Sequence, residues 1–305
     1  MNEVYPEVPH WDGVNVATLL AVKREPQANG AVLFCSRCNE DNRNGRVFGG
    51  QLLGQALRAA QATVAADRPA TILQVLFAQG ALASAPIEYR VRTLQEGKRF
   101  SSRQVEAHQG ERTLISAHLT FQLPMDGPQH AIAPHRPVPP PEQLKSMPEL
   151  TGTPGLEGFD WDWFQKPCLE LRVVDPGSHL STCSATPQTA HWVRLRAPLG
   201  DDPGMHAAAL AYLSDYWINT AAITHHVPAK DVVATKYVAS LNHSLWLHRA
   251  CRADDWLLFS TESPSTQGER ALTNARIYDR NGMMVASAAQ ECLFAPRPAI
   301  SSNER

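Results

Sequence analysis

The stretch that decides the fold is Met205–Ile223, with the sequence MHAAALAYLSDYWINTAAI. It follows Pro203-Gly204 and is apolar nearly all round. A helix of that composition must be buried on most of its sides. The sequence therefore predicts one long helix over residues 205–223 that the rest of the second half encloses.

Asp215 lies in the middle of this predicted helix and is the only Asp, Glu, Lys or Arg between Asp202 and Lys230. A lone carboxylate on a buried helix is costly unless it is hydrogen-bonded or its pKa is raised. Such a cost often marks a functional residue. The alternative is a structural Asp that caps a neighbouring backbone group or points into a wet gap beside Asn219.

The first half of the chain carries a second helix signal ahead of its strands. Residues 50–66 follow the turn at 46–49 and repeat apolar residues at helical spacing, namely Leu53, Leu57, Ala60 and Val64. Residues 87–92 and 115–121 then alternate apolar with polar side chains, as antiparallel strands with one wet face do. In the second half we predict strands at Trp256–Phe259, Leu272–Tyr278 and Met284–Leu293, with a hairpin turn at 279–282.

A proline-rich segment separates the two halves. Nine of the 23 prolines lie between residues 124 and 154, and Pro137, Pro139, Pro140 and Pro141 exclude a helix interior or a central strand there. We predict an N-terminal domain over 1–125, a surface linker over 126–158, a C-terminal domain over 159–296 and a tail over 297–305.

The two halves repeat one another at a shift of 171 residues. Gly97 aligns with Gly268, and Ser116 aligns with Ser287, in each case within similar neighbouring residues. Agreement on one shift favours duplication of a single fold. The predicted class is α+β, with two antiparallel sheets that are each wrapped around a central long helix.

Composition limits the partners. The 305 residues carry 28 Lys and Arg against 30 Asp and Glu, a net charge of −2, without a basic run. Such a chain is not expected to bind nucleic acid. No secretory signal and no apolar run of about 18 residues is present, so we expect a cytoplasmic protein without a membrane span. The C-terminal residues 300–305 lack a peroxisomal Ser-Lys-Leu.

The six cysteines are then expected to be reduced thiols. Cys35 and Cys38 have the spacing of a zinc or redox pair, but no second pair completes four ligands, so incidental spacing is the preferred interpretation. No metal and no cofactor are expected.

Several polar residues remain as candidates. Gln290 ends an apolar run inside a predicted strand, where it is either an inward amide that needs partners or an outward polar residue. His243 and His248 are either general-base candidates or, as we prefer, solvated surface residues. Neither a Gly-x-Ser-x-Gly elbow nor a phosphate loop is present, which argues against two large enzyme classes.

Five motifs, in order over residues 40–295, resemble the type II acyl-CoA thioesterases of the TesB family. They are RVFGGQLLGQA at 46–56, GKRFSSR at 97–103, AYLSD at 211–215, SLNHSLWLHR at 240–249 and VASAAQE at 285–291. The resemblance implies a double hotdog fold and hydrolysis of fatty acyl-CoA. It also implies that an Asp, Ser or Thr and Gln trio holds the attacking water, and it assigns these roles to Asp215, Ser240 and Gln290.

The chain departs from the family pattern at two places. Asn242 stands where an acidic residue is common, and Gln74–Gln79 replaces a stretch that is usually richer in His and Arg. Arg46, Lys98, Arg99 and Arg103 are candidates for contacts with CoA phosphates, with solvated surface charge preferred for any one of them.

Two other functions are alternatives to hydrolysis. A hotdog enoyl-CoA hydratase would use a similar scaffold but would need an Asp and His pair near a helix start, and a non-catalytic protein would only bind acyl-CoA. All three proposed catalytic residues lie after the linker, so we predict one site per chain that the first half completes. A homo-oligomer, either a dimer or a tetramer, is expected.

Overall fold

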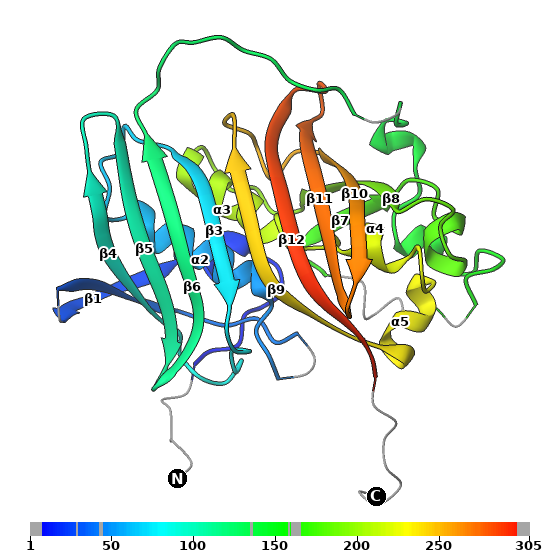
Figure 1. The fold of residues 1–305 in the computed structure, drawn as a ribbon, viewed down its shortest axis with the longest axis horizontal. Coiled ribbons are helices and arrows are strands. Elements are labelled where there is room, and N and C mark those ends of the chain that lie inside the picture. The colour runs from blue at the N-terminus through cyan, green and yellow to red at the C-terminus, as the bar shows by residue number, and fades with distance from the viewer. Residues whose placement is uncertain are drawn as a thin grey trace, which may run out of the picture.

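The structure, a computed structural model, describes residues 8–28, 30–42, 45–134, 137–157, 159 and 166–297. Twelve strands of this part form one sheet in which all neighbours are antiparallel (Figure 1). The first half contributes β1 Val22–Ala28, β2 Ala31–Ser36, β3 Ala70–Phe77, β4 Glu88–Glu96, β5 Phe100–Gln109 and β6 Arg112–Gln122. The second half contributes β7 Leu169–Val173, β8 Gln188–Leu195, β9 Lys236–Leu247, β10 Leu257–Gln267, β11 Arg270–Asp279 and β12 Met284–Pro296.

The halves have the same strand order. From its outer edge to the middle of the sheet, the first half runs β1-β2-β4-β5-β6-β3 and the second runs β7-β8-β10-β11-β12-β9. The prediction of two separate sheets was wrong, because residues 72–76 of β3 pair with residues 242–246 of β9. Joining the two inner edges gives their backbone N–H and C=O groups partners, which an exposed edge would lack.

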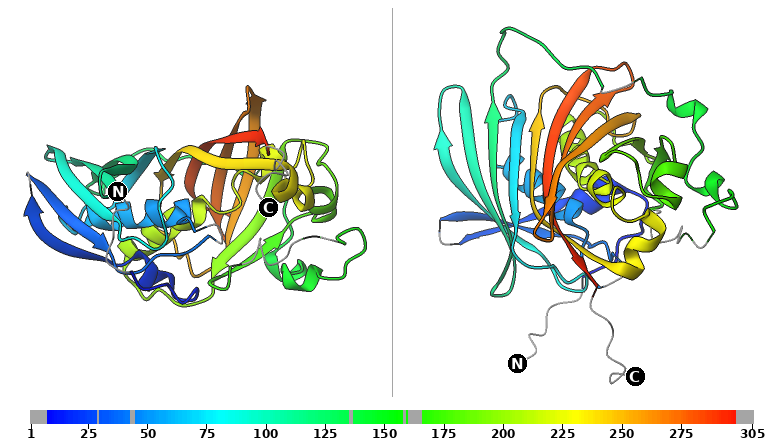
Figure 2. Two further views of the ribbon diagram at one scale, coloured as in Figure 1. Left: turned by 90° about the horizontal axis from the view of Figure 1, so that it is seen from below. Right: turned by 45° about the vertical axis from the view of Figure 1, so that its right-hand side comes forward.

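Two central helices, α2 (Gly49–Gln61) and α3 (Pro203–Ser214), lie against the face around which the sheet curves (Figure 2). They pack against each other in opposite directions. A side-chain Cβ added at Gly50 would lie 2.4 Å from the carbonyl oxygen of Tyr212, so only glycine permits this approach. At the other end, Arg58 forms an ion pair of 3.1 Å with Asp202.

Both central helices are shorter than the sequence predicts. Helix α2 ends at Gln61 rather than at residue 66. Just after this end, the Thr63 N–H bonds to the carbonyl of Ala60, three residues back instead of four. The helix predicted over 205–223 breaks after Ser214 and resumes as the short α4 (Thr220–Ile223). Trp217 between them has a φ of 68°, a left-handed conformation in which a right-handed helix cannot continue.

The predicted strands of the second half are present with longer bounds. Strand β10 continues from the predicted Trp256–Phe259 segment to Gln267, and β11 and β12 contain the other two. The hairpin between them is confirmed: Gly282 has a φ of 79° and donates its N–H to the carbonyl of Asp279.

The two remaining α-helices of the described residues are short. Helix α1 (Val16–Leu20) packs against α2 and α3, and α5 (Ala229–Thr235) precedes β9. Within the described part of the chain, none of the helices combines the length and hydrophobicity that a transmembrane span needs.

The proline-rich segment arches from the end of β6 to the second half (Figure 1). Its described residues contain two short 3₁₀ helices, Pro141–Gln143 and Pro148–Leu150. Val138 and Leu144 pack against a buried cluster on the outer side of the sheet, made of Val174, Ala190, Trp192, Trp256, Leu258 and Tyr278. This segment therefore covers part of the second half as well as connecting the two.

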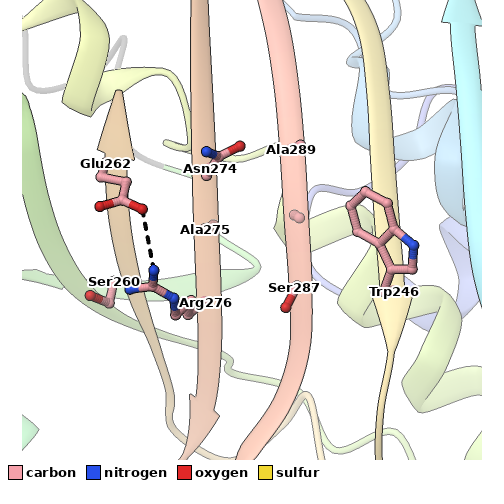
Figure 3. A pocket seen from close by; sticks show the side chains of 9 residues that line it. Trp246, Ser260, Glu262, Asn274, Ala275, Arg276, Ser287 and Ala289 are labelled. Atoms are coloured by element: carbon pink, nitrogen blue, oxygen red, sulfur yellow. Dashed lines mark hydrogen bonds and ion pairs between the residues drawn. The ribbon is translucent and has the colours of Figure 1, made fainter. Parts of the chain in front are cut away.

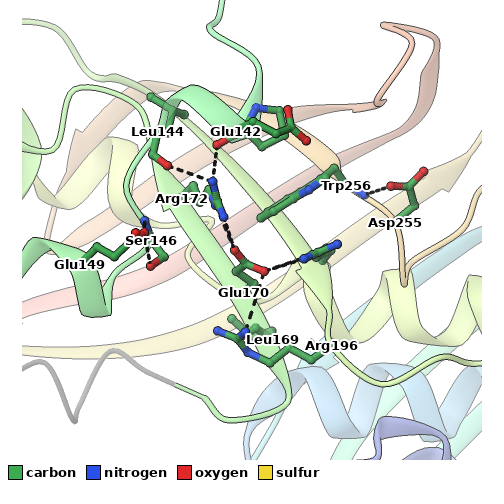
Figure 4. A network of polar contacts seen from close by, with 12 residues as sticks. Glu142, Leu144, Ser146, Glu149, Leu169, Glu170, Arg172, Arg196, Asp255 and Trp256 are labelled. Carbon is green, nitrogen blue, oxygen red and sulfur yellow. Dashed lines mark hydrogen bonds and ion pairs between the residues drawn. The ribbon is translucent and has the colours of Figure 1, made fainter.

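A network of hydrogen bonds and ion pairs holds the proline-rich segment against the second half (Figure 4). Arg172 donates to the carbonyl oxygens of Pro141 and Leu144 and also to the carboxylate of Glu170. Glu170, which is buried, also accepts from Arg194 at 2.8 Å. Because these groups neutralise one another, we assign the network a structural role.

Candidate active site

The sequence predicts Asp215 in the middle of a helix, but in the structure it lies at the end of α3. It is the C-cap residue, with φ of −85°, and is 9% exposed. The carboxylate reaches the start of α2: a Cβ added at Gly49 would lie 2.6 Å from Asp215 Oδ2 and 3.3 Å from the ring of Phe77. Gly49 and Phe77 belong to the first half, so both halves surround this carboxylate.

The three residues that the family motifs assign come together in space. Ser240 on β9 donates from Oγ to Asp215 Oδ1 at 3.4 Å, and Gln290 on β12 donates from Nε2 to Ser240 Oγ at 2.8 Å. Gln290 is fully buried, so its amide faces inward. The pairing of β9 with β12 explains why Ser240 and Gln290 lie close together. The two strands are neighbours, and their register shifts between Glu291 and Cys292, opposite Ser240.

His243 continues this chain of hydrogen bonds. It is fully buried, its Nδ1 is hydrogen-bonded to Gln290 Oε1, and its Nε2 lies 2.9 Å from Ser214 Oγ. The preference for a solvated His243 was therefore wrong, because His243 lies on the inward-facing side of β9 together with the buried Leu245, two residues further along the strand. Burial lowers the pKa of His243, against the raising effects of the Asp215 charge and the Gln290 hydrogen bond.

His248 does not belong to this site. Its Nε2 lies 2.9 Å from Ser287 Oγ at an exposed position. Partial burial of its ring by neighbouring atoms lowers the pKa of His248 as well. The two histidines of the motif therefore have different surroundings, and only His243 contacts the Asp215, Ser240 and Gln290 group.

The first turn of α2 offers backbone donors beside Asp215. Phe48, the N-cap residue, makes no side-chain hydrogen bond to the helix start. The first N–H groups of a helix have no intrahelical partner, and they attract negative charge. Gly49 lies next to the carboxylate, so the start of α2 is close to any group bound beside Asp215.

A buried ion pair across the two halves supports both helix ends, and the sequence analysis missed it. Lys166 and Glu40 form a salt bridge with side chains 13% and 11% exposed. Tyr212 on α3 donates to Glu40 Oε2 at 3.0 Å, and the Lys166 ammonium lies 3.8 Å from the ring centroid of Phe48. Burial is the main reason that the pKa of Tyr212 is raised well above its usual value. Sequence patterns could not pair residues 126 positions apart.

The cationic candidates for CoA contacts separate into two groups. Arg103 is 3% exposed and bonded to Glu96 at 2.6 Å, so its interpretation as a solvated surface charge was wrong. Lys98 and Arg99 are exposed, and exposed Arg46 donates to the carbonyl of Gly80 at 3.1 Å. The buried Arg103 is thus occupied by an ion pair with the half-exposed Glu96.

The cysteine pair has no metal-site surroundings in the part of the chain that the structure describes. Cys38 is buried and Cys35 partly buried, and burial raises the pKa of both thiols. No group of three His, Cys, Asp or Glu side chains that could hold a metal ion occurs among the described residues.

A shallow pocket of about 280 Å³ lies on the other face of the sheet (Figure 3). Trp246, Arg276 and Ser287 contribute to its lining. Because side chains alternate along a strand, these residues point away from the helices, whereas Gln290 and His243 point toward them. This pocket is separate from the Asp215 site.

Comparisons with known proteins agree with the motifs. Residues 39–122 match the family model of the acyl-CoA thioesterase N-terminal domain, and residues 141–294 match that of the C-terminal domain. Acyl-coenzyme A thioesterase 8 of Mus musculus is 33% identical over 271 residues, which cover 85% of this chain and 83% of that protein. The solved acyl-CoA thioesterase II TesB2 of Mycobacterium marinum has a TM-score of 0.75 at 29% identity, over 93% of this chain and 99% of that one.

The fold has a wider distribution. A protein with a hot dog fold from Alicyclobacillus acidocaldarius has a TM-score of 0.70 at 15% identity, over 94% of this chain and 100% of that one. At that identity the likeness concerns the fold alone. The family indicated by the sequence motifs is confirmed by the two domain models and the mouse relative: the chain belongs to the acyl-CoA thioesterase family.

Proposed function

We propose that this protein hydrolyses acyl-CoA thioesters to a free carboxylic acid and CoA at the site around Asp215. Membership in the family supports the reaction. The observation that carries the choice of site is the hydrogen-bonded series Asp215, Ser240 and Gln290 beside the start of α2.

The proposed reaction is a direct attack by water. Asp215 accepts a proton from the water, while the Ser240 hydroxyl and the Gln290 amide hold the water in line with the thioester carbon. The new C–O bond forms first and gives a tetrahedral intermediate with negative charge on the former carbonyl oxygen. The C–S bond breaks as this intermediate collapses, and the proton held by Asp215 passes to the departing sulfur. A thiol with a pKa of about 8.5 leaves with little proton donation, so one carboxylate suffices.

Negative charge develops on the thioester oxygen during the attack. We assign its stabilisation to the backbone N–H groups of Gly49 and Gly50, which the α2 helix dipole reinforces. The first half of the chain would thereby supply the donors and the second half the base and the water-holding groups. Each chain then has one site, located where the two halves meet.

The domain division is part of this proposal. We assign a double hotdog, with residues 1–125 and 159–296 as the two units and α2 and α3 as their central helices. The repeated strand order and the two consecutive family models support the division. The second model begins at residue 141, within the predicted linker, which agrees with the packing of Leu144 on the second half.

The decisive experiment compares the wild type with Asp215→Asn, which keeps the shape and removes the base. Thiol release from acyl-CoA of increasing chain length should lose about 10²- to 10⁴-fold in kcat, the range for removal of a general base. A folded Asp215→Asn protein with wild-type kcat on every substrate would refute the assignment. Hydration of an enoyl-CoA followed in parallel tests the hydratase alternative, and ligand binding without thiol release tests the binding protein.

A further inference from the structure

The hydrogen-bond series at the site extends beyond the proposed catalytic groups to a buried histidine. His243 is fully buried between Gln290 and Ser214. It does not contact Asp215 through a hydrogen bond and has Gln290 and Ser240 between itself and the carboxylate. It is therefore placed to act on the chemistry through Gln290.

The amide of Gln290 has two orientations with opposite consequences. With Oε1 toward His243, its Nε2 donates to Ser240, and the Ser240 hydroxyl is left to donate to Asp215. In the reversed orientation Oε1 would face Ser240, which would then donate to the amide instead of to Asp215. Only the first orientation offers N–H groups to Ser240 and to a water beside it.

The tautomer of His243 selects between these orientations. A ring with hydrogen on Nδ1 donates to Gln290 Oε1, and its bare Nε2 accepts from the Ser214 hydroxyl. A ring with hydrogen on Nε2 would leave Nδ1 as an acceptor, which calls for the reversed amide. The Ser214 hydroxyl can rotate to donate to Nε2 of the Nδ1–H tautomer, and it then gives up its hydrogen bond to the Ala211 carbonyl.

We propose that His243 is a positioning residue: as the Nδ1–H tautomer it holds the Gln290 amide with its amino group toward Ser240 and the attacking water. This inference rests on the proposed function of the site. In the first half of the sheet, the corresponding positions have neither the histidine nor the amide. Leu73 on β3 opposite Leu119 on β6 corresponds to His243 on β9 opposite Gln290 on β12, so a leucine fits this position where no amide needs orienting.

The test uses three substitutions at this position and thiol release from one acyl-CoA. His243→Leu removes both ring nitrogens, His243→Asn keeps a donor where Nδ1 lies, and His243→Gln keeps one near Nε2. We expect His243→Leu to lower kcat about 10- to 100-fold, the usual effect of losing a group that orients a site residue, with KM changed less than about twofold. His243→Asn should recover most of that loss and His243→Gln should not.

The matched control is His248→Asn, which changes the other histidine of the motif at an exposed position and should leave kcat and KM unchanged. Urea unfolding of each variant verifies that it is folded. If the leucine variant does not fold, the asparagine and glutamine variants alone decide the question.

Two results would overturn the inference: wild-type kcat in folded His243→Leu, or equal kcat in the asparagine and glutamine variants. Either result together with an inactive Asp215→Asn rejects the role of His243 and keeps the proposed function. Wild-type kcat in Asp215→Asn rejects the proposed function itself.

Discussion

The two halves of the sheet have the same strands in the same order and differ at a few inward positions. Pairing across β3 and β6 places Leu73 opposite Leu119, and the corresponding pairing of β9 and β12 places His243 opposite Gln290. Ala70 likewise corresponds to Ser240, since each precedes a shift of register in its strand. At these corresponding positions the duplicated scaffold therefore carries polar groups in the second copy only, and the first copy carries apolar residues there.

Replacing the amide by the residue of the other half should have the largest effect. Gln290→Leu, which copies Leu119, is expected to lower kcat about 10²- to 10³-fold, because the water loses its donor and Ser240 loses a partner. Thiol release measures it. The reciprocal Leu119→Gln should create no second site and should lower the free energy of unfolding by about 1–3 kcal/mol, because it buries an unpaired amide. Activity near wild type in Gln290→Leu would remove Gln290 from the mechanism.

The contribution of the first half can be tested at a single glycine. Gly49→Ala adds a Cβ whose ideal position is 2.6 Å from Asp215 Oδ2, so the carboxylate must move. We expect kcat to fall about 10- to 100-fold, as small misplacements of reacting groups do. Gly127→Ala is the control, because no atom lies within 4 Å of its added Cβ. Equal kcat in the two variants would show that Asp215 does not depend on this approach.

A second inward position holds a phenylalanine in the first half and a histidine in the second, and only the histidine can bind a proton. Phe34 lies opposite Tyr89, and His191 lies opposite Phe259 in the corresponding pair of strands. Burial, with a smaller effect from His179, lowers the pKa of His191 to about 3. In the unfolded chain this histidine binds a proton below about pH 6.5, so its contribution to stability is complete above that pH and is lost as the pH falls toward 3.

His191→Phe should therefore reduce the acid sensitivity of the fold. Between pH 7 and pH 5 the wild type should lose about 2 kcal/mol more of its unfolding free energy than the variant does. Urea titrations of both proteins at several pH values measure the difference. Parallel curves would mean that folding does not lower the pKa of His191.

The smallest change is expected at the hydroxyl residue. Ser240→Thr keeps the hydroxyl that donates to Asp215 and should leave kcat within about threefold of the wild type. Ser240→Ala, which copies Ala70, should fall well below the threonine variant because the hydroxyl is lost. Thiol release under saturating substrate compares them, and equal rates for alanine and threonine would exclude a role for the hydroxyl.

Local signals were sufficient for some elements and insufficient for others. The hairpin at 279–282 and the strands beside it depend on neighbouring residues, and the structure contains them. The break of the predicted 205–223 helix after Ser214 goes with the left-handed conformation of Trp217, which periodicity does not record. The homo-oligomer and the cytoplasmic location stay predictions.

The sequence by itself determined the family, indicated the duplication and singled out Asp215 as a candidate. Ordered motifs and a lone charge in an apolar stretch are properties of the chain that no folding is needed to read. Only the tertiary structure decided that the two sheets join through β3 and β9, that His243 is buried behind Gln290, and that Gly49 and Lys166 belong to the surroundings of the site. These facts depend on contacts between residues far apart in the chain, and such contacts exist only when strand register and helix packing bring them together.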